Sequence, residues 1–213
     1  MMDICYCFPA GNHHYAAAYR FLNSYLTYPP MTEHRLVLLC DAANVDEARE
    51  LFAIVPGVVA QPTPDHALDL SRYEAYAQTC GADAMMMLGG SSYCKRTGWG
   101  LRAMAAFQQL GSNAIYGACG NTGAPGVHKH IRTTGWWAAP SLLRKYPYWP
   151  QNAAGRYQAE HGERCLSWWV TAQGGTNWVV TFNGIYPLEQ ANDDAEGYAR
   201  GIGTSMIMGD RLS

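Results

Sequence analysis

The residues best suited to acid–base chemistry stand at positions 160 to 163, in the order Glu-His-Gly-Glu. Tyr157, Trp168 and Trp169 lie close to them in the sequence. A carboxylate beside an imidazole in aromatic surroundings can be tuned to exchange protons near neutral pH. We therefore take Glu160, with His161 beside it, as the leading candidate for a general base. The alternative interpretation is the start of an ordinary amphipathic helix with exposed glutamates.

Two aspartates lie at the ends of predicted elements, where they could bind a ligand. Asp41 follows the apolar stretch Arg35 to Cys40, and an ionised Asp accepts hydrogen bonds from the hydroxyl or N–H groups of a ribose or base. A turn or helix cap would explain Asp41 equally well. Asp69 falls just inside an expected helix, where the helix dipole alone favours a carboxylate, unless Arg72 or Tyr73 lines the same pocket.

The densest basic cluster is His128-Lys129-His130-Ile131-Arg132. The two histidines are two residues apart, so on a strand they would face the same side, as ligands can. Arg132 could hold a diphosphate through two parallel hydrogen bonds. A solvated surface is the alternative explanation for the whole cluster.

The elements that must position these residues alternate between strand and helix in the first half of the chain. Short apolar runs predict strands, and apolar residues at helical spacing predict helices. The order is strand 4–9, helix 15–28, strand 35–40, helix 45–55, strand 57–60, helix 68–80 and strand 84–88. This alternation predicts an α/β fold with a mostly parallel sheet.

The strand Ala84 to Leu88 is expected at the centre, because it is continuously apolar and stops at Gly89-Gly90-Ser91-Ser92. Ligands of open α/β sheets bind beyond the carboxyl ends of the strands. The loop from Pro9, Asp41, Asp69 and the Gly-Gly-Ser-Ser turn should therefore lie near one another. A core strand with a tight turn and no ligand is the plainer alternative.

The second half departs from this alternation. It predicts a helix from 98 to 110, strands at 114–119 and 178–182, an extended segment at 130–134, a short helix at 140–143 and one helix from 156 to 171. We find no repeat or linker, so we expect one domain over 1–213, with a nucleotide-binding half (1–98) and an acceptor half (99–213).

Composition narrows the functional classes. Charged residues make up 15% of the 213, and the net charge is −2, which argues against a nucleic-acid-binding protein. Hydrophobic residues make up 48%, but no apolar run reaches the roughly 18 residues of a membrane span. With no signal-peptide core at the start, we expect a cytoplasmic protein. The seven cysteines include no Cys-x-x-Cys pair, which favours free, buried thiols over a zinc site.

Three common motifs are missing from the sequence. It contains neither the Gly-Lys-Ser/Thr of a Walker loop nor a Gly-x-Gly-x-x-Gly after the first strand. The Gly-x-Ser-x-Gly of α/β-hydrolases is also missing. These gaps disfavour a P-loop enzyme, a dinucleotide-binding fold and a hydrolase.

Several blocks resemble glycosyltransferases of the GT-A fold that use nucleotide sugars. They are Ile-Cys-Tyr-Cys-Phe-Pro-Ala-Gly-Asn (4–12), Leu-Val-Leu-Leu-Cys-Asp (36–41), Leu88 to Trp99, His-Ile-Arg-Thr (130–133), Tyr-Gln-Ala-Glu-His-Gly (157–162) and Asp-Arg-Leu-Ser (210–213). The resemblance covers nearly the whole chain, and the later blocks are similar to those of bacterial glycosyltransferases. It implies a GT-A-like fold and transfer of a sugar from a nucleotide-diphosphate sugar to an acceptor hydroxyl, in polysaccharide biosynthesis.

The chain departs from that family at the end of the central strand. GT-A enzymes usually carry Asp-x-Asp there, which holds a divalent cation on the diphosphate, whereas this chain has Gly89-Gly90-Ser91-Ser92. Hydroxyls alone are poor ligands for a hard cation. We therefore expect metal-independent transfer, with Arg132, Lys95 or Arg96 stabilising the leaving group, while Mg²⁺ or Mn²⁺ stays an open alternative.

The resemblance assigns roles to the candidates named above. It implies that Glu160 is the base, and that Trp136, Trp137 and His161 form the acceptor site. It also implies a donor site made of Pro9, Asn12, Asp41, Asp69, Gly90, Ser91, Ser92 and Arg132. Two alternatives remain: a catalytically inactive module of the same fold that binds nucleotide or carbohydrate, and a protein-interaction subunit with a Trp-rich interface.

Overall fold

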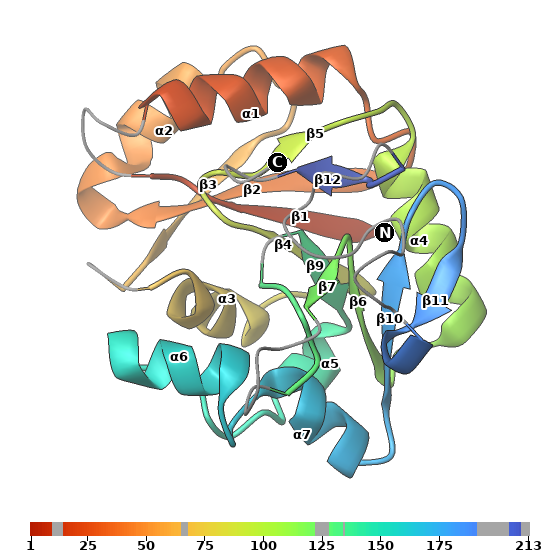
Figure 1. Ribbon diagram of the computed structural model, residues 1–213. Coiled ribbons are helices and arrows are strands. Elements are labelled where there is room, and N and C mark those ends of the chain that lie inside the picture. The colour runs from red at the N-terminus through yellow and green to blue at the C-terminus, as the bar shows by residue number, and fades with distance from the viewer. Residues whose placement is uncertain (10–14, 65–67, 122–127, 134, 191–204, 210–213) are drawn as a thin grey trace.

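The computed structural model describes residues 1–9, 15–64, 68–121, 128–133, 135–190 and 205–209. It is built around one eight-stranded sheet in the order β11-β10-β6-β9-β4-β1-β2-β3 (Figure 1). The strands of this sheet are β1 (Met2–Cys7), β2 (His34–Asp41), β3 (Val59–Thr63), β4 (Ala84–Leu88), β6 (Ala114–Gly117), β9 (Trp136–Ala138), β10 (Thr176–Val180) and β11 (Ile185–Pro187).

Helices and two small strand pairs complete the described structure. The helices are α1 (Tyr15–Thr27), α2 (Val45–Leu51), α3 (Asp69–Ala77), α4 (Trp99–Leu110), α5 (Pro140–Leu143), α6 (Ala153–His161) and α7 (Leu166–Ala172), with single 3₁₀ turns η1 (Ala42–Asn44) and η2 (Leu188–Gln190). β5 (Tyr93–Cys94) pairs with β12 (Met208–Gly209), and β7 (Gly120–Asn121) with β8 (His130–Ile131). The α/β fold predicted from the sequence is confirmed.

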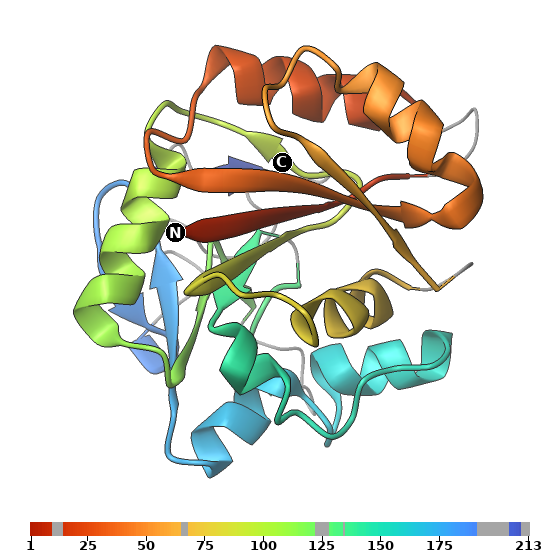
Figure 2. The same cartoon turned by 180° about the vertical axis from the view of Figure 1, so that it is seen from behind.

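Strands β1 to β4 are parallel and lie in the middle of the molecule, between helices on both faces (Figures 1 and 2). Helices α1 and α2 lie above this part of the sheet in Figure 1, and α3 lies below it. All residues of β4 are fully buried, as are most of those in β1. Burial on both faces explains why these strands read as apolar runs without alternation.

The sheet continues through an antiparallel strand into the second half of the chain. Strand β9 lies between β4 and β6, and Trp137 pairs with Met86 on one side and Tyr116 on the other. The rings of Trp137 and Tyr116 stack at 5.6 Å. The proposed nucleotide-binding and acceptor halves therefore contribute strands to one continuous sheet.

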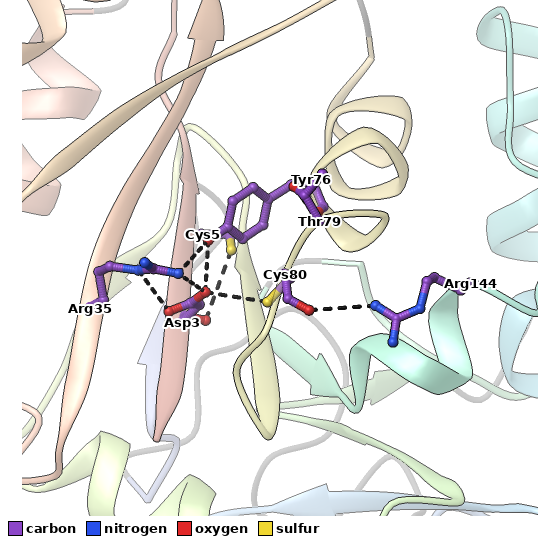
Figure 3. A network of polar contacts seen from close by, with 7 residues as sticks. All are labelled: Asp3, Cys5, Arg35, Tyr76, Thr79, Cys80 and Arg144. Atoms are coloured by element: carbon purple, nitrogen blue, oxygen red, sulfur yellow. Dashed lines mark hydrogen bonds and ion pairs between the residues drawn. The ribbon is translucent and has the colours of Figure 1, made fainter.

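A buried polar network closes the amino-terminal edge of the parallel strands (Figure 3). The Asp3 carboxylate is fully buried and accepts hydrogen bonds from Arg35 Nη2 at 2.7 Å and Tyr76 Oη at 2.7 Å. The Cys80 thiol lies 3.3 Å from the same carboxylate. Nearby, Arg144 donates to the Ala77 carbonyl at 2.7 Å at the end of α3. The network joins β1, β2, α3 and α5.

The predictions of several elements need correction. The single helix expected over 156–171 is two helices, α6 and α7, because the chain at Gly162 is extended and the Gln158 side chain occupies the space of a Cβ there. The third strand lies at Val59–Thr63, two residues later than expected. The segment at Trp136–Ala138 is strand β9, which the sequence did not predict.

All seven cysteines are free and buried, as the sequence predicted. Burial raises the pKa of both the Cys40 and Cys80 thiols to about 11, and that of Cys94 to about 12. Among the described helices, none has the length and apolar character needed to cross a bilayer.

Candidate active site at the carboxyl edge of the sheet

The ends of β1 and β4 meet closely at the carboxyl edge of the sheet. Tyr6 Oη donates a hydrogen bond to the Gly90 carbonyl at 2.8 Å. A Cβ at Gly90 would lie 3.2 Å from the Cys7 carbonyl oxygen and 3.4 Å from Pro9 Cβ. Pro9 and Gly90 are thus neighbours, as the sequence predicted, and glycine permits this close approach. Asn12, predicted beside them, lies outside the described residues.

The Asp69 carboxylate lies beside this junction. Asp69 opens α3, and its Oδ2 lies 3.4 Å from the position of a Cβ on Gly89. Both sequence interpretations of Asp69 are therefore compatible with its place, since it starts a helix and also faces the glycine turn.

Asp41 ends β2 in an ion pair with Arg72 of α3. Arg72 Nη1 also donates to Thr63 Oγ1 at 3.0 Å, and that hydroxyl donates to the Cys40 carbonyl at 3.0 Å. The side chains of Asp41 and Arg72 are only 13% and 8% exposed. This chain of contacts fastens α3 to the ends of β2 and β3, so Asp41 has a structural role whether or not it also meets a ribose.

Ser91 and Ser92 differ in their surroundings. The Ser91 carbonyl accepts a hydrogen bond from Arg20 Nη2 at 2.7 Å, and the Arg20 guanidinium lies 4.6 Å from the centre of the Tyr93 ring. Ser92 is fully buried, so its hydroxyl is not presented to a ligand in this structure. The turn therefore offers Ser91 and the cation Arg20, which the sequence analysis missed.

Glu160 lies on α6 with its carboxylate held in one orientation. Oε1 accepts from Thr133 Oγ1 at 2.5 Å and from Arg156 Nε at 3.2 Å, and the side chain is 15% exposed. Asn152 caps the helix by accepting from the Gly155 amide at 2.8 Å. Arg156 and Thr133 were not among the predicted site residues. Arg156 could have been predicted from the sequence, because residues four apart on a helix are neighbours and an arginine at that distance can pair with Glu160.

Arg156 connects α6 to the sheet edge. Burial acts to lower its pKa, yet the pKa is raised, because the Glu160 and Asp69 carboxylates favour the charged guanidinium. The same guanidinium acts to lower the pKa of the Cys7 thiol at the end of β1, although burial raises that pKa overall. Arg156 thus stands within electrostatic range of two carboxylates, Glu160 on its own helix and Asp69 beside the glycine turn.

His161 lies beside the carboxylate rather than in a separate acceptor site. Its Nε2 is 3.6 Å from Glu160 Oε2, and its Nδ1 is buried with no hydrogen-bond partner among the described residues. The His130 ring lies 4.6 Å from the His161 ring. His130 is buried, whereas His128 stacks on Trp168 at 5.3 Å. The two histidines predicted to face one way therefore contact different partners.

Arg132 follows β8, with its amide donating to the Cys119 carbonyl at 3.2 Å. Its charge is one of the influences that lower the pKa of His130, after burial and His161. Arg132 therefore lies near the Glu160 cluster. Arg96, offered as an alternative cation for the leaving group, instead covers the Phe182 ring at 4.5 Å.

The two tryptophans assigned to the acceptor face lie inside the molecule. Trp136 is 1% exposed and Trp137 is 0% exposed, because β9 runs through the middle of the sheet. Trp136 packs edge-on against Tyr73 at 6.2 Å. Neither ring presents a face to solvent, so the assignment of these residues to an acceptor surface is corrected.

The turn Gly89 to Ser92 itself offers no carboxylate to a divalent cation, and the Asp69 carboxylate lies beside it. Mg²⁺ is commonly held by one or two carboxylates together with waters and substrate phosphates. In the described part of the chain, no three His, Cys, Asp or Glu side chains gather so as to hold one.

By sequence, the chain matches no family model and none of the curated proteins. Its fold is similar to that of a nucleotidyl transferase from Methanothermobacter thermautotroptrophicus, with a TM-score of 0.54 and 11% identity over 84% of this chain and 85% of that one. It is also similar to the bifunctional IspDF of Campylobacter jejuni, with a TM-score of 0.50 and 13% identity over 84% of this chain and 49% of that one. At such identities the comparisons establish a shared α/β fold.

Proposed function

We propose that this protein is a nucleotide-dependent transferase that moves a sugar from a nucleotide-diphosphate sugar to an acceptor hydroxyl. The observation that carries the proposal is the position of Arg156, which binds Glu160 on α6 and acts on Asp69 beside the Gly89 turn. The arginine that holds the candidate base is thereby near the edge where α/β sheets bind ligands. The fold shared with a protein described as a nucleotidyl transferase supports a nucleotide-containing donor.

The donor would lie along the carboxyl edge of β1 to β4. Pro9, Asn12, Asp41 and Asp69 would hold the nucleoside, and the Gly90–Ser91 turn would meet the diphosphate. Arg20, which is bonded to the Ser91 carbonyl, supplies a positive charge at that turn. A guanidinium suits the diphosphate because its donors match two phosphate oxygens at once. Arg132 is the second candidate cation.

The reaction needs one proton acceptor and one charged leaving group. Glu160 takes the proton as the acceptor oxygen attacks the anomeric carbon, and the bond to the nucleoside diphosphate breaks with its electron pair leaving on the phosphate oxygen. Thr133 and Arg156 keep the carboxylate pointed one way. Positive charge at Arg20 and Arg132 stabilises the departing diphosphate. This direct displacement inverts the anomeric configuration.

Glu160→Gln provides the test of the proposed base. The amide keeps the size of the side chain but cannot take a proton, so we expect turnover to fall by at least about 100-fold. Donor binding, measured by calorimetry, should be unchanged. Glu50→Gln, on the exposed side of α2, is the matched control. Full activity in Glu160→Gln would refute the assignment.

A second candidate reaction is nucleotidyl transfer, the activity in the description of one fold neighbour, and we choose a sugar phosphate as the acceptor to be tested. The two reactions release different products, namely a nucleoside diphosphate in sugar transfer and pyrophosphate in nucleotidyl transfer. Incubating the protein with nucleotide sugars and, separately, with nucleoside triphosphates and sugar phosphates distinguishes them. Binding without either product, with and without EDTA, would favour a non-catalytic binding module.

A further inference from the structure

A groove of about 800 Å³ runs along α6, the helix that carries the proposed base. It is bounded by the loop before α6 and by the turn after it. The side chains that line it include Tyr148, Trp149, Tyr157, Gln158, Glu163 and Arg164. We call it the α6 groove. Its volume falls within the roughly 300–1,000 Å³ usual for small-molecule sites.

Exposed aromatic rings line the α6 groove. Tyr157 is 54% exposed and Tyr148 is 43% exposed. The Arg164 guanidinium lies 5.6 Å from the Tyr148 ring centre, and the Trp149 ring packs edge-on against Tyr146 at 5.2 Å. Such rings offer flat apolar faces with polar tips, which suits ligands with apolar C–H faces and hydroxyl edges.

A second, smaller cavity of about 190 Å³ adjoins the first. His128 lines both, and its ring stacks on the half-exposed Trp168 of α7 at 5.3 Å. We call this the Trp168 cavity. The shared His128 shows that the two hollows are neighbours.

The Trp168 cavity contains an unsatisfied buried acceptor. Asn177 is 3% exposed, and its Nδ2 donates to the Ser167 carbonyl at 2.9 Å and to Thr171 Oγ1 at 2.8 Å. These bonds fix the amide orientation, which leaves Oδ1 with no partner among the described residues. Buried polar groups are normally hydrogen-bonded. Asn177 lines the cavity, so a hydroxyl bound there is a candidate for the missing donor.

Tyr157, which lines the α6 groove, lies beside the His161 ring that neighbours the proposed base. The Tyr157 ring lies 5.2 Å from the His161 ring, whose Nε2 is 3.6 Å from Glu160 Oε2. The lining charges balance, since Glu163 is offset by Arg164. Amide and hydroxyl groups, which both donate and accept, make up much of the remaining polar lining. A neutral ligand rich in hydroxyls fits this lining better than a phosphate polymer does.

We propose that the α6 groove and the Trp168 cavity together bind a neutral oligosaccharide, and that its end near Glu160 is the acceptor. Tyr157 and Tyr148 stack on the sugar units nearest the base, while Trp168 and Asn177 hold units farther along the chain. Affinity should therefore increase with the number of sugar units. The acceptor role rests on the proposed transfer reaction, whereas the binding itself can be measured without it.

The test is direct binding to malto-, cello- and chito-oligosaccharides of one, two, four and six units, measured by calorimetry. We expect affinity for one series to rise at least about 10-fold from one to four units. Tyr157→Ala should weaken binding of every length by at least about 10-fold. Trp168→Ala should remove the extra affinity of the longer chains and leave the affinity for the shorter ones unchanged.

Matched variants distinguish stacking from folding. Tyr157→Phe and Trp168→Phe keep an aromatic face and should retain most of the binding. Tyr19→Ala removes a tyrosine that is 51% exposed on α1 and should change nothing. Circular dichroism checks that each variant is folded.

Three results would overturn the proposal: no binding by any of the three series, affinity independent of length, or equal losses in Tyr19→Ala. Binding of a peptide or polynucleotide in place of the sugars would also overturn it. Length-dependent binding without transfer under any condition would refute the proposed reaction and leave the oligosaccharide site standing. Transfer to a single sugar with no effect of chain length would support the proposed reaction and refute the oligosaccharide site.

Discussion

Arg20 is the residue whose contacts add most to the proposed donor site. Its guanidinium is bonded to the Ser91 carbonyl and covers Tyr93, at the turn where a carboxylate pair would be expected in the resembling enzymes. A cation fixed there can meet a diphosphate without a metal ion. No pattern around position 20 distinguishes this arginine from a solvated helix residue, so only the packing of α1 on β5 shows its partner.

Removing the Arg20 charge should weaken donor binding. A hydrogen bond to a charged group contributes about 1.5–3 kcal/mol, so Arg20→Ala should lower affinity for a nucleoside diphosphate about 10- to 100-fold. Calorimetry with UDP, GDP and CDP measures this. Arg49→Ala, which breaks only a surface pair with Asp46 on α2, is the control. Equal affinities in the two variants would exclude Arg20 from the site.

His130 makes stability depend on pH. Burial, followed by His161 and Arg132, lowers the pKa of His130 below its usual 6.5, while the His128 carbonyl and Glu160 oppose the shift. The unfolded chain therefore binds this proton more readily than the folded one. The stabilisation is complete above about pH 6.5 and is lost as the pH falls toward the folded pKa.

Urea unfolding at about pH 7.5 and about pH 5 tests this effect. Between these two pH values, we expect the free energy of unfolding to fall less in His130→Gln than in the unmodified chain. His128→Gln, two residues away on the same segment, should behave like the unmodified chain. Identical pH dependence in all three proteins would show that His130 does not contribute.

At the level of the elements, the amino-terminal edge of the sheet depends on Asp3. The buried carboxylate joins β1 to β2 through Arg35 and to α3 through Tyr76 (Figure 3). Asp3→Asn leaves donors there without a charged acceptor and should cost about 1–3 kcal/mol. The Arg35 side chain is 41% exposed and can regain water, which keeps the cost moderate.

Urea midpoints at constant slope measure the loss in Asp3→Asn. Asp46→Asn, on the fully exposed Asp46 side chain, is the comparison and should shift the midpoint little. Because the network lies at the edge opposite the candidate site, nucleoside diphosphate binding should survive in both variants. Lost binding in a folded Asp3→Asn protein would contradict this separation.

Elements with a strong local pattern were predictable from the sequence. Ala84–Leu88 and Trp99–Leu110 match their predicted ranges within a residue, because apolar runs and helical spacing report local burial. Strand β9 was missed because its partners, Met86 and Tyr116, are distant in sequence. Pro9, Asp69 and Gly90 were placed by the rule that strand ends converge. Arg20 and Thr133 were not predictable, since tertiary contacts alone bring them to the site.

For the whole molecule, the continuous sheet implies that the two halves stabilise each other. Strand β9 is paired to β4 from the first half and to β6 from the second. We therefore expect a single unfolding transition, with tryptophan fluorescence and far-ultraviolet circular dichroism giving coincident curves in urea. Trp99 and Trp178 lie outside β9 and add reporters elsewhere in the fold. Two separate transitions would indicate independent domains.

The buried cysteines make local unfolding of this protein measurable through the reactivity of its own thiols. Their thiols lie on β1, β2 and β5, after α3 and β6, and before α7, and burial holds each described pKa high. A thiol reagent can attack only when the surrounding structure parts and a thiolate forms. The order in which the seven sites become modified therefore traces which layers separate first, and it does so in the unaltered chain without an added label.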